Sequence, residues 1–403
     1  MLQDSVKRFT SAYEDALEWL FAQTRGGAPR STERMRTLVT GLELVSPPNV
    51  VHVVGTNGKG SVAAMVAAGF EAAGRRTGRF VSPHVVDFRE RITVNGRWIS
   101  EADVVRFVQD LPRLEPAPAF FELTLALALR HFASERVEVA VIEAGVGAKR
   151  DATRVLQNVR AVVITNVGRD HLDMLGPTLR DVALDKADAI RPGVPTLTST
   201  TGEALGVITK IAAARGSPLF GMAQPDTPQN PFHLPPGIPE RTPTEKHNQR
   251  LAAATLRLNR ASEAAIFRGL HAKLPARAER FRVGDKEVVL DGAHNPDAAQ
   301  ALLEHTLTSH DQRPFVLLFG ALPKKLGAET LAVLEPYAEH VVLTNAVPDE
   351  GSTLPPSPKA EFVTEPEAAL ARSLTRCRRG GMVVIAGSFY LAGRLRPTLK
   401  WSN

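Results

Sequence analysis

Short apolar runs alternate with longer segments of helical period along the first half of the chain. Runs at residues 50–55, 137–145 and 160–168 are rich in valine and isoleucine and contain few polar residues. Segment 121–135 instead spaces its leucines and alanines as a packed helix does. Nearly continuous apolar strands separated by helices are typical of a parallel sheet that is covered on both faces. The pattern therefore predicts an α/β fold with a mostly parallel, doubly wound sheet.

The alternation stops in a passage with seven prolines, residues 225–243, and then begins again. We expect a helix over residues 247–270 on its periodicity. Four further apolar runs follow it, at 286–295, 313–322, 338–346 and 380–388. The sequence thus predicts a large domain, residues 1–272, and a smaller Rossmann-like α/β domain, residues 273–403.

Composition narrows the class of protein. A chain of 403 residues with 43% hydrophobic and 23% charged residues is ordinary for a globular protein of two domains. The net charge of +6 suits anionic substrates, and no basic–aromatic motif predicts nucleic-acid binding. Cys377 is the sole cysteine, which excludes an intrachain disulfide and a cysteine-built zinc site. With no signal core and no apolar run of about 18 residues, we expect a cytoplasmic protein without membrane contact.

The segment VVGTNGKGSV, residues 53–62, joins a predicted strand to a predicted helix. Bare backbone amides and a helix N-terminus favour a bound phosphate, and Lys59 would add a mobile cation. A Walker A loop has a hydroxyl residue directly after its lysine, whereas Gly60 follows here and Ser61 comes next. A plain glycine turn remains the alternative. The candidate ATP-binding residues are Gly55, Thr56, Asn57, Gly58, Lys59, Gly60 and Ser61.

Ten further segments accompany this loop in one fixed order. They are YEDALEWL, ERMRTLV, VSPHVVDFRERITVNG, FFELTLALA, EAGVGAKRDAT, ITNVGRDHLDMLG, DKADAIRPG, LDGAHN, FGAL and AGSFYLAG. With the loop, the series resembles the ATP-dependent amide ligases of the Mur ligase superfamily, most closely the branch of folylpolyglutamate synthase and dihydrofolate synthase. The resemblance covers nearly the whole chain.

The resemblance implies a ligase that joins L-glutamate to dihydropteroate, to the glutamyl tail of folate, or to both. A carboxylate is a poor electrophile, so such a ligase first transfers the ATP γ-phosphoryl group to it, which gives an acyl phosphate. The partners implied are ATP, glutamate, the pterin substrate and Mg²⁺ at two sites. Members of the family are commonly monomers.

Candidate metal ligands follow the predicted strands. Glu143 ends one strand, where the ligand crevice of an open parallel sheet lies, and its carboxylate suits a hard cation. The resemblance adds Ser61 and Ser82 to the first ion. It makes His171, in preference to its neighbour Asp170, a ligand of the second ion. It also implies that Lys186 is carbamylated and binds the second ion, so that Lys59, Lys186 and His171 are the candidate catalytic residues.

Other positions are assigned through the resemblance alone. Asn248, Arg277 and Asp291 are expected at the nucleotide, and Arg277 would bind phosphate with a planar guanidinium. His294 is expected near the incoming glutamate or the nucleotide. The candidate substrate-binding residues are Phe121, Asp151, Thr153, His294 and Ser388.

The chain also departs from the family pattern. Ala148, Lys149, Arg150 and Arg154 replace the usual residues near the expected pterin pocket, and Leu251 replaces an asparagine expected at adenine. Lys324 and Lys325 stand in a stretch that usually contains aspartate. Two alternatives therefore stay open: a cell-wall ligase that uses a UDP-linked precursor, and a nucleotide-binding module that has lost its ligase activity.

Overall fold

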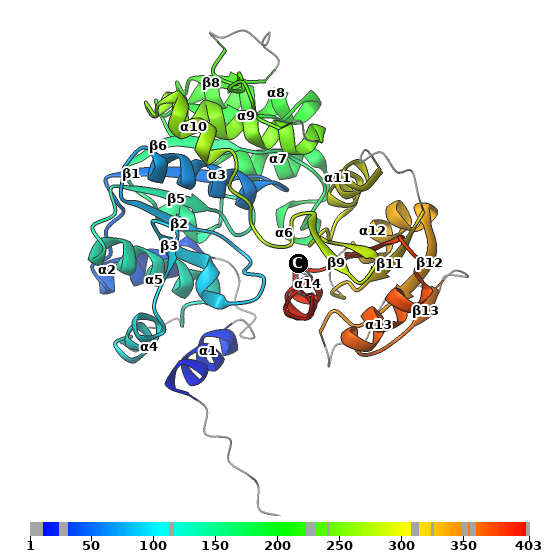
Figure 1. Cartoon of the computed structure of the whole chain (residues 1–403). Helices are drawn as coiled ribbons and strands as arrows, with labels where there is room; N and C mark the ends of the chain where they lie inside the picture. The colour runs from blue at the N-terminus through cyan, green and yellow to red at the C-terminus, as the bar shows by residue number, and fades with distance from the viewer. Residues whose placement is uncertain are drawn as a thin grey trace, which may run out of the picture.

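The computed structural model describes residues 11–23, 31–112, 117–222, 230–239, 242–307, 314–323, 326–347, 354 and 360–399. These residues form two lobes, each built around its own sheet (Figure 1). The lobe drawn from blue to light green holds the first sheet, and the lobe drawn from yellow to red holds the second. The predicted α/β class with mostly parallel sheets is confirmed.

The first sheet has the strand order β4-β3-β2-β5-β1-β6-β7-β8. Its pairs are parallel except at one edge, where β3 runs antiparallel to both β2 and β4. The carboxyl ends of the central strands β5, β1 and β6 therefore meet at one edge of the sheet. The strands are β1 Asn49–Val54, β2 Thr77–Phe80, β3 Ile92–Val94, β4 Arg97–Trp98, β5 Val139–Glu143, β6 Val159–Ile164, β7 Thr196–Thr198 and β8 Leu219–Gly221.

Helices cover both faces of this sheet because alternate residues of its strands point to opposite sides. Val51 and Val53 of β1 pack in an apolar cluster with residues of α3, α9 and α10, whereas Val50 packs in another with residues of α2 and α5. The helical segments are α1 Ala12–Ala22, α2 Thr32–Gly41, α3 Lys59–Ala72, η1 Phe88–Arg91, α4 Glu101–Gln109, α5 Phe120–Ser134, η2 Ala152–Val155, α6 Leu172–Leu175, α7 Leu179–Ala187, α8 Gly202–Ala214, α9 Pro243–Leu258 and α10 Glu263–Gly269.

The second sheet has the order β13-β12-β11-β14-β10-β9, and only the β9–β10 pair is antiparallel. Its strands are β9 Glu279–Val283, β10 Lys286–Leu290, β11 Phe315–Phe319, β12 Ala338–Leu343, β13 Ala360–Phe362 and β14 Met382–Ala386. Its helical segments are α11 Pro296–Leu307, α12 Gly327–Leu334, η3 Glu335–Tyr337, α13 Pro366–Arg376, α14 Phe389–Leu395 and η4 Arg396–Thr398. Helices α6 and α14 lie where the two lobes face each other (Figure 1).

The helix expected over residues 247–270 is two helices, α9 and α10, so that prediction was wrong. Arg260 adopts φ +62°, a left-handed conformation that ends the first helix. Ser262 then caps the second helix, because its hydroxyl accepts a hydrogen bond from the Ala265 N–H at 3.3 Å. The proposed domain boundary at 272/273 falls in the segment between α10 and β9.

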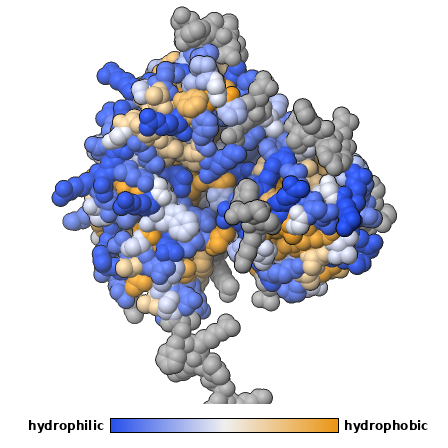
Figure 2. All heavy atoms as spheres, in the orientation of Figure 1, coloured by the Kyte–Doolittle hydropathy of each residue, from blue (hydrophilic) through white to orange (hydrophobic). Residues whose placement is uncertain are grey.

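Hydrophilic residues cover much of the face drawn in Figure 2, and hydrophobic residues form separate patches among them. None of the helices in the described ranges combines the length and the apolar character that crossing a bilayer requires. Within the proline-rich passage, residues 230–239 form turns and irregular structure, as predicted.

Candidate functional site

The glycine loop lies between the end of β1 and the start of α3, as the sequence predicts. Gly55 has φ +151° and Gly58 has φ +81°. A Cβ atom at Gly55 would lie 1.9 Å from Thr165 Oγ1, and one at Gly58 would lie 2.4 Å from Asn248 Oδ1. Only glycine fits these two positions, and the loop leads directly into the N-terminus of α3.

The end of β6 holds the loop in place. The Asn57 backbone N–H donates to Asn166 Oδ1 at 2.8 Å, and Thr165 Oγ1 donates to the Asn57 carbonyl at 2.6 Å. Thr56 Oγ1 accepts from the Gly168 N–H at 2.9 Å. The sequence analysis missed Thr165 and Asn166, although two polar residues directly after an apolar strand were a usable signal.

A cavity of about 560 Å³ opens beside this loop. Residues of both lobes line it, so the tertiary structure brings together most of the predicted site. The predicted residues that line this cavity are Gly55, Thr56, Asn57, Gly58, Lys59, Ser82, Phe121, Glu143, Asp151, His171, Lys186, Arg277, His294 and Ser388.

Five predicted residues lie elsewhere. Ser61, Asn248 and Asp291 line a second cavity, of about 140 Å³, which shares Asn57, Gly58 and Arg277 with the first. Gly60 and Thr153 belong to the lining of neither. Gly60 is buried at the start of α3, where a Cβ atom would lie 3.3 Å from Glu143 Oε2.

Glu143 ends β5 and is only 2% exposed. Its Oε2 accepts from the Ser82 N–H at 3.1 Å, and its Oε1 lies 4.0 Å from Lys59 Nζ. Burial raises the pKa of Glu143, and the charge of Lys59 opposes that rise. The buried anion therefore gains from a cation placed in the cavity.

The donor set fits a hard cation that keeps other ligands. In the part of the chain that the structure describes, no three or more His, Cys, Asp or Glu side chains are grouped to hold a metal ion. Magnesium is usually bound through one or two carboxylates, with waters and substrate phosphates completing its octahedron. Glu143, beside Ser82 and the glycine loop, matches that arrangement better than a site built of protein ligands alone.

Lys186, on α7, is buried at 3% exposure against the glycine loop. Its Nζ donates to the Gly55 carbonyl at 2.9 Å. Burial and the positive charge of Lys59 lower the pKa of Lys186 to about 7, against the opposing influence of Asp170 and other carboxylates. From the sequence alone, Lys186 would be interpreted as a surface cation. In the folded protein, much of the amine is instead uncharged near pH 7.

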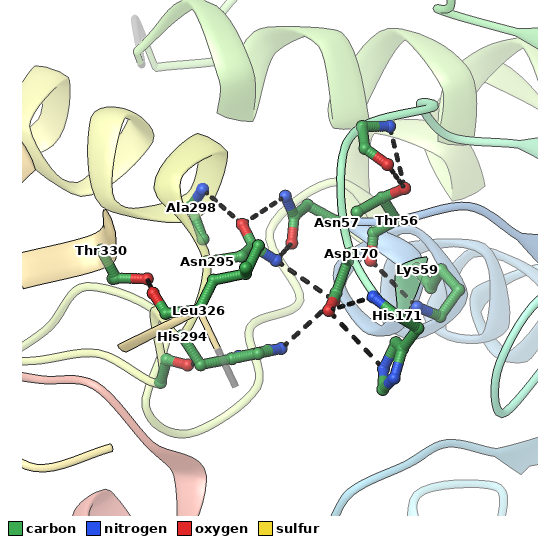
Figure 3. A network of polar contacts seen from close by, with 12 residues as sticks. Thr56, Asn57, Lys59, Asp170, His171, His294, Asn295, Ala298, Leu326 and Thr330 are labelled. Carbon is green, nitrogen blue, oxygen red and sulfur yellow. Dashed lines mark hydrogen bonds and ion pairs between the residues drawn. The ribbon is translucent and has the colours of Figure 1, made fainter. Parts of the chain in front are cut away.

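Asp170 is the centre of a polar network that joins the lobes (Figure 3). His171 Nε2 lies 3.8 Å from Asp170 Oδ1, and His294 Nε2 lies 3.7 Å from Asp170 Oδ2. Asn295 Nδ2 donates to Asp170 Oδ2 at 3.3 Å. The side-chain amides of Asn295 and Asn57 also exchange hydrogen bonds of 3.0 and 3.1 Å. The structure thus gives Asp170 a larger share in the site than the sequence analysis did.

Asp151 lines the large cavity at the start of η2, and Thr153, which does not line the cavity, holds its carboxylate by a hydrogen bond. Thr153 Oγ1 donates to Asp151 Oδ1 at 2.6 Å and lies 2.9 Å from His52 Nε2. Because the threonine proton is given to Asp151, His52 Nε2 is the donor in the second contact. Burial lowers the pKa of His52 to about 3, which keeps the ring neutral. The sequence analysis missed His52, because nothing in the sequence distinguishes a histidine inside an apolar strand that serves a site from one that is simply buried.

Another part of the lining of the large cavity combines aromatic rings with arginine. The Arg91 guanidinium lies 5.1 Å from the centroid of the Phe120 ring. Arg34 forms a buried ion pair with Glu122, with Nη2 and Oε1 separated by 3.0 Å. Such a wall suits a flat, anionic substrate.

The second lobe contributes the opposite wall. The Arg277 guanidinium stacks 4.4 Å from the Phe389 ring centroid, and the His294 ring meets Phe389 edge-on at 5.7 Å. Asp291 Oδ2 accepts from the Ala278 N–H at 2.7 Å, and burial raises its pKa.

The residues that differ from the family pattern lie in different parts of the structure. Arg150 lines the large cavity, whereas Leu251 is fully buried in the apolar cluster under α3 and lines neither cavity. Lys324 and Lys325 lie outside the described residues.

Comparison with known proteins agrees with this architecture. Residues 53–190 match the Mur ligase middle domain, and residues 276–389 match the Mur ligase glutamate ligase domain. A folylpolyglutamate synthase of Lacticaseibacillus casei is 31% identical over 390 residues, which cover 87% of this chain and 89% of that protein.

Two further relatives extend the comparison. A probable bifunctional folylpolyglutamate synthase/dihydropteroate synthase of Halobacterium salinarum is 31% identical over 97% of this chain, which spans about half, 52%, of that relative. A bifunctional folylpolyglutamate synthase/dihydrofolate synthase of Yersinia pestis, solved with AMPPNP and a manganese ion, superimposes with a TM-score of 0.84 at 26% identity. That superposition covers 97% of this chain and 98% of the other.

Proposed function

Because the chain belongs to the folylpolyglutamate synthase and dihydrofolate synthase family of Mur ligases, we propose that it joins L-glutamate to a pterin carboxylate at the expense of ATP. The acceptor is dihydropteroate, the glutamyl tail of a folate, or both. The Yersinia pestis relative was solved with an ATP analogue and a divalent ion, which supports the same requirements here. The monomeric state and the cytoplasmic location expected from the sequence belong to this proposal.

One observation carries the proposal. The glycine loop, a buried carboxylate and a buried lysine line the same cavity as an arginine, a histidine and a serine of the second lobe. Activation of a carboxylate needs a phosphate cradle next to the acceptor, and displacement of the phosphate needs the amine on the other side. A cavity shared by the two lobes offers both positions.

The residues of the chain have separate parts in this scheme. The loop amides and Lys59 bind the transferred phosphoryl group, and Arg277 neutralises it from the second lobe. Asp151, held by Thr153, binds the pterin, with Phe121 beside it. His294 and Ser388 position the glutamate. Enclosure between the lobes keeps water from the acyl phosphate, whose hydrolysis would waste ATP.

Glu143 and Ser82, which line the large cavity, would hold one magnesium ion, with Ser61 of the adjoining small cavity as the third expected ligand, and His171 with a modified Lys186 would hold another. When bound, these ions would neutralise phosphate oxygens and the developing charge of the group in transfer. Lys59, 4.0 Å from Glu143 Oε1, compensates part of the carboxylate charge.

We further propose that Lys186 is carbamylated. Its neutral amine nitrogen would bond to the carbon of carbon dioxide and release a proton, which turns a cation into an anionic oxygen donor. The lowered pKa of about 7 supports this, because the neutral amine is the reactive form. Lys186→Ala should therefore lose turnover severely and regain part of it with added acetate; normal activity of the variant would rule the carbamate out.

A substrate panel with isotope-labelled glutamate tests the main proposal. Mass gain on dihydropteroate or tetrahydrofolate that requires ATP is the expected result. Mass gain only on a UDP-muramyl precursor would establish the cell-wall alternative instead. Nucleotide binding without turnover in any mixture would establish the inactive binding module, which the apolar Leu251 favours.

A further inference from the structure

The smaller cavity adjoins the large one at the glycine loop. Asn57, Gly58 and Arg277 line both cavities, and Ser61 and Asn248 line the small one. A nucleotide whose phosphates lie on the loop and point toward Glu143 must extend its nucleoside away from the large cavity. The small cavity, of about 140 Å³, is where that nucleoside arrives.

Gln249 is an unsatisfied polar group in the wall of this cavity. The side chain lies on α9 and is 2% exposed. Within the described part of the chain, neither its Nε2 nor its Oε1 has a hydrogen-bond partner. An amide that is buried without partners costs free energy, so such a group in a native protein needs an explanation, and a ligand that pairs with it is one.

The helix explains why this residue can reach the cavity. Glu245, Asn248 and Gln249 are spaced i, i+3 and i+4, so they share one face of α9, and all three line the cavity. Leu251 lies on another face and packs against α3. An asparagine at position 251 would thus meet the apolar cluster, whereas Gln249 belongs to the lining of the cavity.

A second unsatisfied atom belongs to a lining residue from the other lobe. His305, on α11, lines the cavity, and its buried Nε2 has no partner in the described part of the chain. Its Nδ1 lies 3.4 Å from Glu245 Oε2. Met65, Leu270, Leu274 and Leu302 supply apolar surface around these polar atoms. The cavity therefore suits a flat ring with a polar edge.

We propose that Gln249 reads the base of the bound nucleotide and sets the preference for adenine. Its Oε1 accepts a hydrogen bond from the 6-amino group, and its Nε2 donates to the adjacent ring nitrogen, the pairing that a glutamine amide makes with adenine. This inference rests on the proposed use of ATP, and it makes position 249 a specificity-determining residue of that site.

The test is a direct binding measurement on the full chain, independent of ligase turnover. The probes are ATP and purine riboside 5′-triphosphate, which lacks the 6-amino group but keeps the ring and the phosphates. Wild-type protein should bind ATP about tenfold or more tightly than this analogue, because the analogue leaves the buried amide oxygen unpaired. Gln249→Leu should bind both nucleotides equally, with ATP weakened by a similar factor.

Thermal unfolding separates this role from a structural one. Gln249→Leu removes two unsatisfied atoms, so the ligand-free variant should melt at or above the wild-type temperature, while the upward shift on ATP addition shrinks. Gln249→Glu keeps the acceptor and loses the donor, so it should bind ATP more weakly than wild type. The matched control is Gln300→Leu, at an exposed position of α11 that does not line the cavity, and it should behave as wild type.

The outcomes separate the inference from the proposed function. If wild type prefers ATP and Gln249→Leu keeps that preference, the inference is overturned and the ligase proposal stands. If wild type binds neither triphosphate, both are overturned. If Gln249→Leu melts far below wild type, the amide is structural and the inference fails, with Gln249→Glu as the check on binding.

Discussion

Lys186 offers a test of how burial controls this site. The change is Lys186→Met, which keeps an unbranched side chain and removes the amine. In the native protein Lys186 is 3% exposed, and the pKa of its amine falls from 10.5 to about 7 through burial and the nearby charge of Lys59. Unfolding exposes the lysine and restores its ordinary pKa. At a pH between these two pKa values, folding therefore requires the amine to lose a proton.

The sign follows from proton binding. Between about pH 7 and pH 10.5 the unfolded chain binds more protons than the native one, so stability rises with pH in that window. At about 1.36 kcal/mol for each pKa unit, the lysine costs about 4 kcal/mol of stability at pH 7 and about 2 kcal/mol at pH 9. Raising the pH from 7 to 9 should thus add about 2 kcal/mol to wild type through this group and nothing to the variant.

Urea unfolding of ligand-free protein at both pH values measures the difference. Buffers free of carbon dioxide and divalent metal keep the amine unmodified. Lys210→Met is the matched control, since Lys210 is an exposed lysine of helix α8. Its pH dependence should match wild type, whereas Lys186→Met should have a flatter one and a higher stability at pH 7. Equal pH dependence in wild type and Lys186→Met would refute the argument that burial holds this amine near neutrality.

Three further predictions concern other parts of the molecule. Lys59→Ala should reduce ATP-dependent phosphate release about a hundredfold or more, because no other mobile cation of the loop meets the phosphate; Lys59→Arg should keep more activity. Arg34→Met should lower the free energy of unfolding in urea by roughly 3–5 kcal/mol, because it leaves Glu122 buried and unpaired, and adding Glu122→Gln should restore part of it. In wild type, the His52 ring with its pKa of about 3 binds fewer protons in the folded chain than in the unfolded one, so acidification from about pH 6.5 toward pH 3 lowers the stability. His52→Leu should lessen this loss, and melting curves over that pH range measure it.

The residues at the strand ends show how much of the site the sequence patterns predict. Glu143, the glycine loop and His171 all follow apolar runs, and parallel strands bring such positions to one edge. Their presence in one cavity was therefore expected, and the structure places them there. Thr165 and Asn166 carry the same signal, yet only the β1–β6 pairing shows that they hold the loop.

Other residues gave no signal that a linear pattern contains. His52 lies within a strand and was indistinguishable from a buried strand residue until Thr153 appeared beside it, 101 positions away in the sequence. Gln249 was one of several polar residues on a helix. Its lack of partners depends on which side chains surround it, and these come from both lobes.

The sequence by itself determined the α/β class, the glycine loop between β1 and α3 and the family, because periodicity and short motifs are local properties of the chain. The tertiary structure decided which distant groups meet, such as Asp170 with Asn295 across the two lobes. It also decided that Lys186 is a buried amine with its pKa lowered to about 7, about half neutral at pH 7, instead of a surface cation. The physical reason is that burial and charge proximity arise only from packing, so protonation states and unsatisfied hydrogen bonds are features of the folded molecule alone.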